Sequence, residues 1–350
     1  MNEAAAQLDA HVREIVRFHL SPETGTPFWL DLARAHGMDP EEIHGFDDLR
    51  RFPRFEDEWL RSEAPERFIP RAYAGRPYKV FETGGTTGMP KQRLSWDDHL
   101  TDYDAFSETL SDSHFPRGAA WLMVGPTGPR RLRLAIEHLA NIRGGPCFFV
   151  DVDPRWVKKV LAGGDSKAAK QYMAHVVDQA VTILKHRKIQ CLFTTPKLLE
   201  AMGEVIDLRA AGIRGVFCGG TSMTSQTVRF LVEEVLGPDI WFAPTYGNTL
   251  MGLAVNKPIT AADGYRLTYF APQPRAVLRV VDPADYDRVV DYDAWGRVEL
   301  STLTREFFMP RFLERDEAVR RAPWGRYAWD GVGEVRPFRA IADAVVEGVY

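Results

Sequence analysis

Residues 83–91, Thr-Gly-Gly-Thr-Thr-Gly-Met-Pro-Lys, form the densest group of side chains in this sequence that could do chemistry. Glycine lets backbone N–H groups approach an anion closely, threonine hydroxyls donate hydrogen bonds, and lysine supplies a positive charge. This combination predicts a phosphate-binding loop. Lys91 lies between Pro90 and Gln92 rather than between Gly and Ser or Thr, so the loop is not a Walker A sequence. The alternative is a flexible turn between a strand and a helix.

Such a loop must be positioned by regular elements, and the sequence predicts them. Runs rich in β-branched and aromatic residues predict strands at 76–82, 119–125, 146–152, 190–196, 213–219 and 239–245. Stretches with helical spacing lie between several of them, at 96–112, 130–142, 167–188, 196–204 and 224–236. This alternation predicts an α/β fold with a mostly parallel sheet covered by helices on both faces. Residues 151–164 are expected to form an exposed connection.

The two ends of the chain differ from this middle part. Residues 4–20 have apolar positions at helical spacing, and residues 27–75 predict helices interrupted by prolines. After about residue 255 the sequence predicts a smaller, β-rich subdomain. The expected organisation is a helical N-terminal region at 1–75, an α/β core with the phosphate loop at 76–255, and a β-rich subdomain with a short tail at 256–350.

The composition of the 350 residues excludes several classes of protein. The net charge of −4 does not favour nucleic-acid binding, and no apolar stretch reaches the roughly 18–20 residues of a membrane span. The three cysteines lie far apart, which disfavours a disulfide framework and predicts a cytoplasmic protein. No His-Glu-x-x-His or Gly-x-Ser-x-Gly pattern occurs, which disfavours a protein-ligated catalytic metal and a serine hydrolase.

Residues 83–91 resemble the signature loop of the adenylate-forming superfamily, which comprises acyl-CoA synthetases, nonribosomal-peptide adenylation domains and luciferases. The resemblance implies that the loop holds the β- and γ-phosphates of ATP while a carboxylate is activated. It implies catalytic roles for Thr86 and Lys91 and nucleotide binding by the rest of the loop. The nucleotide-binding positions are Thr83, Gly84, Gly85, Thr87 and Gly88.

Residues 245–249, Thr-Tyr-Gly-Asn-Thr, are similar to the superfamily's Tyr-Gly-x-Thr-Glu motif. The similarity implies that Tyr246 packs against the adenine and that Thr249 binds the α-phosphate as a catalytic residue. It also implies that the backbone at Gly247 and Asn248 lines the acyl pocket. The alternative is an ordinary turn at the end of a strand.

Two further segments resemble nucleotide-binding parts of the superfamily. Gly219-Gly220-Thr221 is similar to the turn that touches the adenine, although Gly-Gly turns are common. The segment from Arg311 to Asp316 resembles one whose aspartate accepts both ribose hydroxyls, a role that suits a carboxylate with two acceptor oxygens. The alternative for the second segment is a surface aspartate in a charged turn.

The sequence departs from the superfamily pattern in two places. Leu250 stands where a glutamate that helps to hold Mg²⁺ is usual. Because Mg²⁺ requires oxygen ligands, either another acid replaces this glutamate or the metal is held by ATP phosphates and water. The chain also ends soon after Asp316, so we expect the usual mobile C-terminal domain, with its catalytic lysine, to be absent.

The segment from Leu49 to Phe55 resembles the entry region of the phenylacetate–CoA ligase branch, and the short chain resembles enzymes within it that adenylate phenazine acids or form benzoxazoles in natural-product pathways. This resemblance implies ATP-dependent activation of a small aromatic carboxylic acid, with Mg²⁺, as its acyl adenylate. The acyl group would pass to an amine, hydroxyl or thiol of a second small molecule or a partner enzyme. Two alternatives stay open: a CoA ligase completed by a partner, and a degenerate nucleotide- or acid-binding protein without turnover. No nucleic-acid or membrane partner is expected, and a homodimer is the candidate assembly.

Two weaker groups of residues are open to more than one interpretation. Arg130, Arg131 and Arg133 begin the predicted helix at 130–142 and could meet a second carboxylate of the substrate, but a solvated helix face is the expectation. Cys218 could be a nucleophile, but a small buried core residue is expected.

Overall fold

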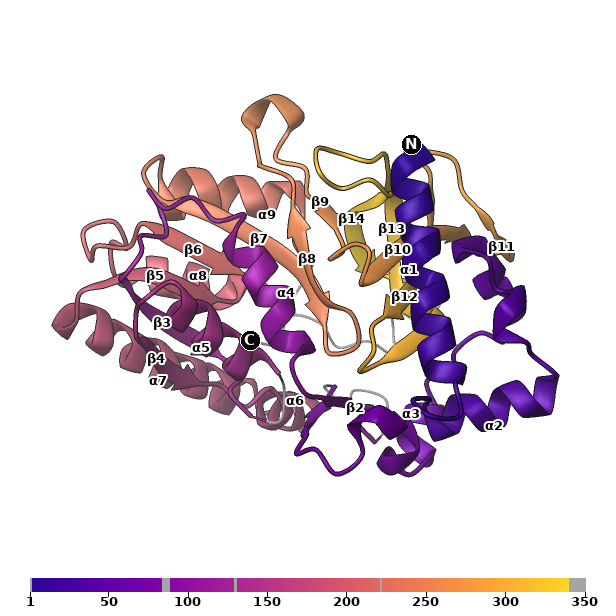
Figure 1. The fold of residues 1–350 in the computed structure, drawn as a ribbon. Helices are drawn as coiled ribbons and strands as arrows, with labels where there is room; N and C mark the ends of the chain where they lie inside the picture. The colour runs from indigo at the N-terminus through magenta and orange to yellow at the C-terminus, as the bar shows by residue number, and fades with distance from the viewer. Residues whose placement is uncertain (1, 84–88, 129–130, 221, 340–350) are drawn as a thin grey trace.

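The computed structural model describes residues 2–83, 89–128, 131–220 and 222–339, and the description that follows is confined to them. Within these ranges the main sheet has twelve strands, in the order β11-β10-β12-β13-β14-β9-β8-β7-β6-β5-β3-β4, and β1 pairs with β2 in a separate ribbon (Figure 1). The strands are β1 (Lys79–Glu82), β2 (Gln92–Ser95), β3 (Ala120–Gly125), β4 (Cys147–Asp151), β5 (Ile189–Thr194), β6 (Gly215–Cys218), β7 (Trp241–Asn248), β8 (Gly252–Asn256), β9 (Thr268–Phe270), β10 (Ala276–Asp282), β11 (Asp285–Val289), β12 (Trp295–Leu303), β13 (Phe308–Arg321) and β14 (Gly331–Pro337). The α-helices are α1 (Asn2–Leu20), α2 (Pro27–His36), α3 (Trp59–Ser62), α4 (Asp98–Ser107), α5 (Leu132–Ile142), α6 (Pro154–Ala162), α7 (Ser166–His186), α8 (Pro196–Gly203) and α9 (Ser225–Phe230).

One half of the sheet is parallel and covered on both faces. Strands β4, β3, β5, β6 and β7 run parallel to one another. Successive side chains of a strand point to opposite faces. Accordingly, Leu122 and Val124 of β3 belong to the hydrophobic cluster that includes α7 and α8, whereas Trp121 and Met123 belong to the cluster that includes α4 and α5. The predicted α/β architecture is therefore confirmed for this half.

The parallel arrangement ends at β7, because the chain turns back after Asn248 and β8 pairs with β7 antiparallel. The strands from β8 to β14 are joined by antiparallel pairs, as the β-rich character after residue 255 predicted. The long strand β13 contains the segment from Arg311 to Asp316. The register between β12 and β13 shifts at residues 314–316, a stretch that includes Glu314 and Asp316.

The N-terminal helices pack against the antiparallel half of the sheet, where α1 lies alongside β12 and β13 in Figure 1. His19 of α1 is 1% exposed, and its Nε2 lies 2.8 Å from the carbonyl oxygen of Thr304. The indole of Trp29 donates a hydrogen bond of 3.0 Å to the carbonyl oxygen of Phe308. These contacts attach the N-terminal region to the strand pair that carries Glu314 and Asp316.

The expectation of an exposed connection at 151–164 is wrong, because Pro154–Ala162 forms helix α6. Asp153 caps this helix, since its side chain accepts hydrogen bonds from the backbone N–H groups of Arg155 and Trp156, and Pro154 occupies the first helical turn. Val157 of this helix is fully buried. In the described part of the chain, no helix is long and apolar enough to cross a membrane.

Candidate functional site

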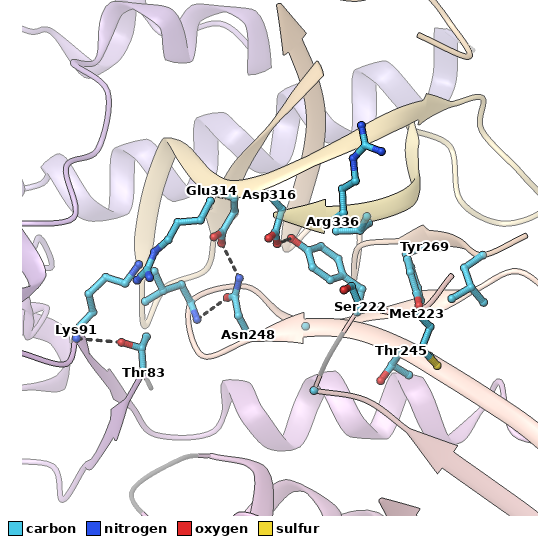
Figure 2. Close-up of a pocket in the computed structure, with 17 residues that line it drawn as sticks. Thr83, Lys91, Ser222, Met223, Thr245, Asn248, Tyr269, Glu314, Asp316 and Arg336 are labelled. Carbon is cyan, nitrogen blue, oxygen red and sulfur yellow. Dashed lines mark hydrogen bonds between the residues drawn. The ribbon is translucent and has the colours of Figure 1, made fainter. Parts of the chain in front are cut away.

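A cavity of about 240 Å³ lies where the carboxyl end of β7 meets β13 and β14 (Figure 2). Ligands of open α/β sheets bind at the carboxyl ends of strands, at the point where the strand order or direction switches. Strand β7 is such a point, because it is parallel to β6 and antiparallel to β8. The predicted site residues that line this cavity are Thr83, Lys91, Gly220, Tyr246, Gly247, Asn248 and Asp316.

Tyr246 and Asp316 are joined across this cavity although they lie far apart in the sequence. The Tyr246 hydroxyl donates a hydrogen bond of 2.7 Å to Oδ2 of Asp316. Burial, together with the Asp316 carboxylate, holds the pKa of the Tyr246 hydroxyl well above its usual value, so this group remains a donor at neutral pH. The Tyr246 ring lies 5.8 Å, centroid to centroid, from that of Tyr269. The hydroxyl bond therefore fixes the direction in which the Asp316 carboxylate faces.

Glu314 is a site residue that sequence reasoning missed. Figure 2 shows it beside Asp316 on β13, and its Oε1 accepts a hydrogen bond of 2.5 Å from the side-chain amide of Asn248. Asn248 is itself held, because its side-chain oxygen accepts hydrogen bonds of 2.8 Å from the backbone N–H groups of Leu250 and Met251. Burial raises the pKa of Glu314, an effect that the nearby Lys91 ammonium opposes. The only sequence signal was an acid two positions before Asp316.

Lys91 is buried, with 4% of its surface exposed, and it is paired. Its Nζ donates a hydrogen bond of 2.8 Å to Oδ1 of Asp57 and lies 4.8 Å from the centre of the Phe312 ring. Burial would raise the pKa of the Asp57 carboxyl, but Lys91 and Arg61 outweigh it and hold that pKa below its usual range. The backbone of Lys91 also pairs with Thr83, whose hydroxyl accepts a hydrogen bond of 3.0 Å from the Lys91 N–H group.

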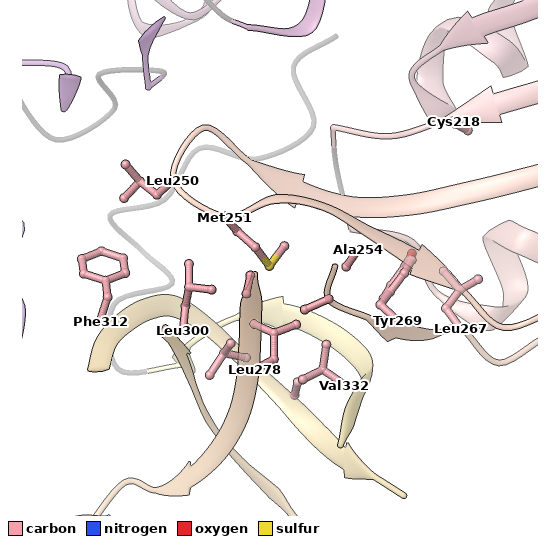
Figure 3. Close-up of a cluster of buried hydrophobic side chains, with 14 of the residues drawn as sticks. Cys218, Leu250, Met251, Ala254, Leu267, Tyr269, Leu278, Leu300, Phe312 and Val332 are labelled. Carbon is pink, nitrogen blue, oxygen red and sulfur yellow. The ribbon is translucent and has the colours of Figure 1, made fainter. Parts of the chain in front are cut away.

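The turn after β7 places Thr249 and Leu250 next to the site. The Thr249 hydroxyl lies 3.4 Å from the carbonyl oxygen of Glu82, to which it donates. Leu250 is 1% exposed and packs in a hydrophobic cluster that also contains Phe312 (Figure 3). The buried guanidinium of Arg93 donates to the carbonyl oxygens of both residues, at 3.2 Å and 2.7 Å.

The position of Leu250 does not fit a Mg²⁺ ligand. Leu250 offers the metal no oxygen from its side chain, and its carbonyl oxygen already accepts from Arg93 and Thr302. In the described residues, no group of three His, Cys, Asp or Glu side chains could hold a metal ion.

Several predicted residues lie elsewhere or outside the description. The structure does not bring Arg311 to this cavity: it lines another one and forms ion pairs with Asp287 and Glu299. Cys218 is fully buried and burial raises its pKa strongly, as expected for a core residue rather than a nucleophile. The remaining predicted positions, Gly84, Gly85, Thr86, Thr87, Gly88 and Thr221, lie outside the described residues.

A second cavity, of about 350 Å³, adjoins the first, with which it shares Asp316 and Asn248. It lies at the carboxyl ends of β5, β6 and β7, where Thr195, Gly219 and Gly247 line it. Gly220 separates the two cavities with a φ of +103°, a conformation that residues with a side chain rarely adopt. The other described walls of the second cavity are mainly apolar. They include Tyr103, Phe193, Phe217 and Leu253, together with the predicted catalytic residue Thr249.

Solved structures share this fold over most of the chain. A 2-hydroxyisobutyryl-CoA ligase, in an open conformation in complex with 2-HIB-AMP and CoA, superposes with a TM-score of 0.69 at 15% sequence identity, covering 95% of this chain and 73% of the ligase. The chain therefore shares the fold of this CoA ligase. The same ligase in its postadenylation state, in complex with R3-HIB-AMP, matches with a TM-score of 0.68 at 16% identity, over 92% of this chain and 64% of its own. In the thioesterification state with 2-HIB-AMP and CoA, the TM-score is 0.68 at 18% identity, over the same shares.

This chain therefore spans 64–73% of the length of the ligase structures whose fold it shares. No family model matches the sequence, and no curated protein matches it. At this level of identity, the similarity establishes the fold, and the chemistry has to be argued from the residues of the site.

Proposed function

We propose that this chain activates a carboxylic acid as its acyl adenylate, with ATP as the second substrate. The observation that carries the proposal is the grouping of Tyr246, Asp316, Lys91 and Thr83 around one cavity that adjoins a second, mainly apolar one. A nucleotide in the first cavity and an acid in the second would meet near Thr249 and Asn248. The shared fold of ligases solved with an acyl-AMP supports this arrangement.

In the proposed reaction a carboxylate oxygen of the acid attacks the α-phosphorus of ATP. A bond forms between these two atoms, the bond from the α-phosphorus to the bridging oxygen breaks, and pyrophosphate leaves. Two anions have to approach each other, so the protein contributes positioning and electrostatic stabilisation rather than a covalent nucleophile.

Each residue has a defined part in this reaction. Asp316, fixed by Tyr246, accepts the ribose hydroxyls, because its carboxylate has further acceptor positions besides the one bound by Tyr246. Thr249 donates to the α-phosphate. Lys91 exchanges its pairing with Asp57 for the leaving pyrophosphate, where a cation stabilises the developing charge.

We propose a small aromatic acid as the substrate class, because flat side chains line the second cavity. Phe193 and Phe217 lie with their ring centroids 4.8 Å apart at an interplanar angle of 69°, and Tyr103 lies 6.1 Å from Phe217. Such faces bind an aryl ring by offset or edge-to-face contact. The acyl group would then pass to an amine, hydroxyl or thiol, which suits an enzyme of the phenylacetate–CoA ligase branch in natural-product biosynthesis.

The test is ATP–pyrophosphate exchange with a panel of aromatic acids. Exchange with at least one acid is expected, and Asp316→Ala should raise the KM for ATP far more than the KM for the acid. Asp330→Ala is a matched control, because Asp330 also accepts from a tyrosine hydroxyl, that of Tyr292 at 3.0 Å, but lines neither cavity. A chain that binds ATP yet supports no exchange with any acid would refute the proposal.

Binding without turnover is the second candidate function, and Leu250 favours it. The side chain at this position cannot contribute to a metal site, so a nucleotide could bind without being activated. Binding of ATP by calorimetry, with no exchange, would be its signature. Detection of an acyl-CoA by mass spectrometry after CoA is added would instead favour a CoA ligase.

A further inference from the structure

The second cavity contains a buried cation, Arg131, that the sequence placed on a solvated helix face. That expectation is wrong for Arg131, which is 7% exposed and precedes α5, whereas the side chain of Arg133 is 49% exposed. Arg131 donates a hydrogen bond of 2.9 Å from Nη2 to Oδ2 of Asp102. Arg130 lies outside the described residues.

Arg131 belongs to a network in which three guanidinium groups form ion pairs with two carboxylates. Asp98 accepts from Arg93 at 2.7 Å and from Arg275 at 2.8 Å. Asp102 accepts from Arg275 at 3.3 Å and from Arg131 at 2.9 Å. Three guanidinium groups thus share two carboxylates. A buried charge is costly unless it is compensated, and Arg131 shares the Asp102 carboxylate with Arg275, so an anion of a ligand would add compensation at Arg131.

The nearest further acid, Glu306, is already occupied by other donors. Its two oxygens accept from the backbone N–H groups of Trp96, Asp97 and Asp98 and from the Ser95 hydroxyl. Most of its hydrogen-bonding capacity is therefore directed at the start of α4. Its negative charge acts on Arg93 at one end of the network, whereas Arg131 at the other end lines the cavity.

Other lining residues also favour an anion. Of the described charged residues that line the cavity, Arg131, Lys158 and Arg315 are cationic and Asp316 is anionic. The Thr195 hydroxyl is buried and has no hydrogen-bond partner among the described residues, although Thr195 lines the same cavity. Such an unsatisfied buried hydroxyl costs free energy that a polar ligand atom would recover.

Gly252 allows the Arg131–Asp102 pair to lie close against the backbone at the start of β8. It has a φ of +109°, and a Cβ at this position would lie 2.4 Å from Oδ2 of Asp102 and 3.5 Å from Nη1 of Arg131. Any side chain here would collide with Asp102. Gly252 and Arg131 both line the cavity.

We infer that the second cavity binds a carboxylic acid that carries a second anionic group, and that Arg131 selects this group. One carboxylate faces the nucleotide and is activated, while the other is bound by the Arg131 guanidinium and the Thr195 hydroxyl. The aromatic walls contact the part of the substrate between the two groups. Asp102 is a positioning residue, because it holds the Arg131 guanidinium by an ion pair of 2.9 Å and does not itself line the cavity. This inference rests on the proposed function and names the substrate class of the same site.

Calorimetric titration of the full chain, with the non-reacting α,β-methylene analogue of ATP present, would compare benzoate with its three dicarboxylate counterparts, phthalate, isophthalate and terephthalate. At least one diacid should bind roughly tenfold or more tightly than benzoate, as expected for an added charge-assisted bond. Arg131→Met should reduce this ratio to about one, whereas Arg133→Met, on the exposed face, should leave it unchanged. The inference is overturned if none of the diacids binds more tightly than benzoate, or if the preference survives in Arg131→Met.

Two further variants test the same assignment if Arg131→Met does not fold, since this substitution removes a partner from a buried carboxylate. Thr195→Val keeps the shape of the side chain and should weaken diacid binding about threefold or more relative to benzoate. Arg131→Lys keeps the charge and should retain part of the preference. An unchanged ratio in Thr195→Val, together with no loss in Arg131→Lys, would contradict the assignment.

Exchange kinetics separate this inference from the proposed function. If diacids bind through Arg131 but support no exchange, the adenylation proposal fails and the anion subsite stands. If monoacids support exchange as well as diacids do, adenylation stands and the selection by Arg131 fails.

Discussion

Tyr246→Phe tests whether the hydroxyl of Tyr246 prepares Asp316 for the ribose of ATP. The substitution removes one oxygen, the donor of the 2.7 Å bond to Oδ2 of Asp316, and keeps the ring next to Tyr269. Without this bond the carboxylate can rotate and take up water. We therefore expect weaker binding of ATP and little effect on the acid.

The expected magnitude follows from the type and the environment of the bond. A hydrogen bond to a charged group contributes roughly 1.5–3 kcal/mol, and this one is only partly buried, so water can replace part of it. A loss of about 1–1.5 kcal/mol corresponds to a KM for ATP that is about 5- to 13-fold higher.

Steady-state exchange at saturating acid would give the KM for ATP, and at saturating ATP the KM for the acid. Tyr292→Phe is the matched control, because its hydroxyl also donates to an aspartate, Asp330 at 3.0 Å, at a place that lines neither site cavity. If Tyr246→Phe leaves the KM for ATP within twofold of the wild type, or raises both KM values equally, Asp316 is not held by Tyr246 for the nucleotide.

Three further predictions concern Lys91, Glu314 and His19. Lys91→Met should lower kcat/KM for ATP in the exchange assay by about tenfold or more, since it removes one charged contact. The fold should survive, because Asp57 also pairs with Arg61. An unchanged kcat/KM would rule out the proposed role of Lys91. Burial raises the pKa of Glu314 in the folded state, so ionisation of this side chain lowers the stability of the protein as pH rises from the unfolded pKa through the folded pKa. The Glu314→Gln variant should therefore be more stable than the wild type in urea unfolding at pH 8. This gain should disappear near pH 4. Burial lowers the pKa of His19 from 6.5 to about 4, so its contribution to stability, about 3 kcal/mol in all, is lost as pH falls from 6.5 towards 4. In His19→Gln the free energy of unfolding should depend less on pH over this range. Equal pH dependence of the unfolding free energy in the variant and the wild type would contradict this prediction.

The local pattern of the sequence determined most of the regular elements. Strands β3 to β7 and helices α5, α7 and α8 lie close to the predicted ranges, because hydrophobic periodicity and turn residues act over short distances. Helix α6 was missed because its signals, the Asp153 cap and Pro154, also occur in turns. Only pairing between strands showed that the parallel arrangement stops at β7.

The residue types of the site were also readable in the sequence, since Tyr246, Asn248, Thr249 and Asp316 all line the cavities. What they do depends on partners that are distant in the sequence. Asp57 lies 34 positions before its partner Lys91, and Asn248 lies 66 positions before Glu314.

Burial was the other property that only the tertiary structure decided. Arg131 and Arg133 are two residues apart and chemically identical, yet one is paired with Asp102 in a cavity wall and the other is exposed. The difference arises because α4 and the β7–β8 turn pack against one side of this segment. The sequence determines the charge and the type of each residue. Whether a charge faces water, a carboxylate or a ligand depends on the elements that the fold places next to it.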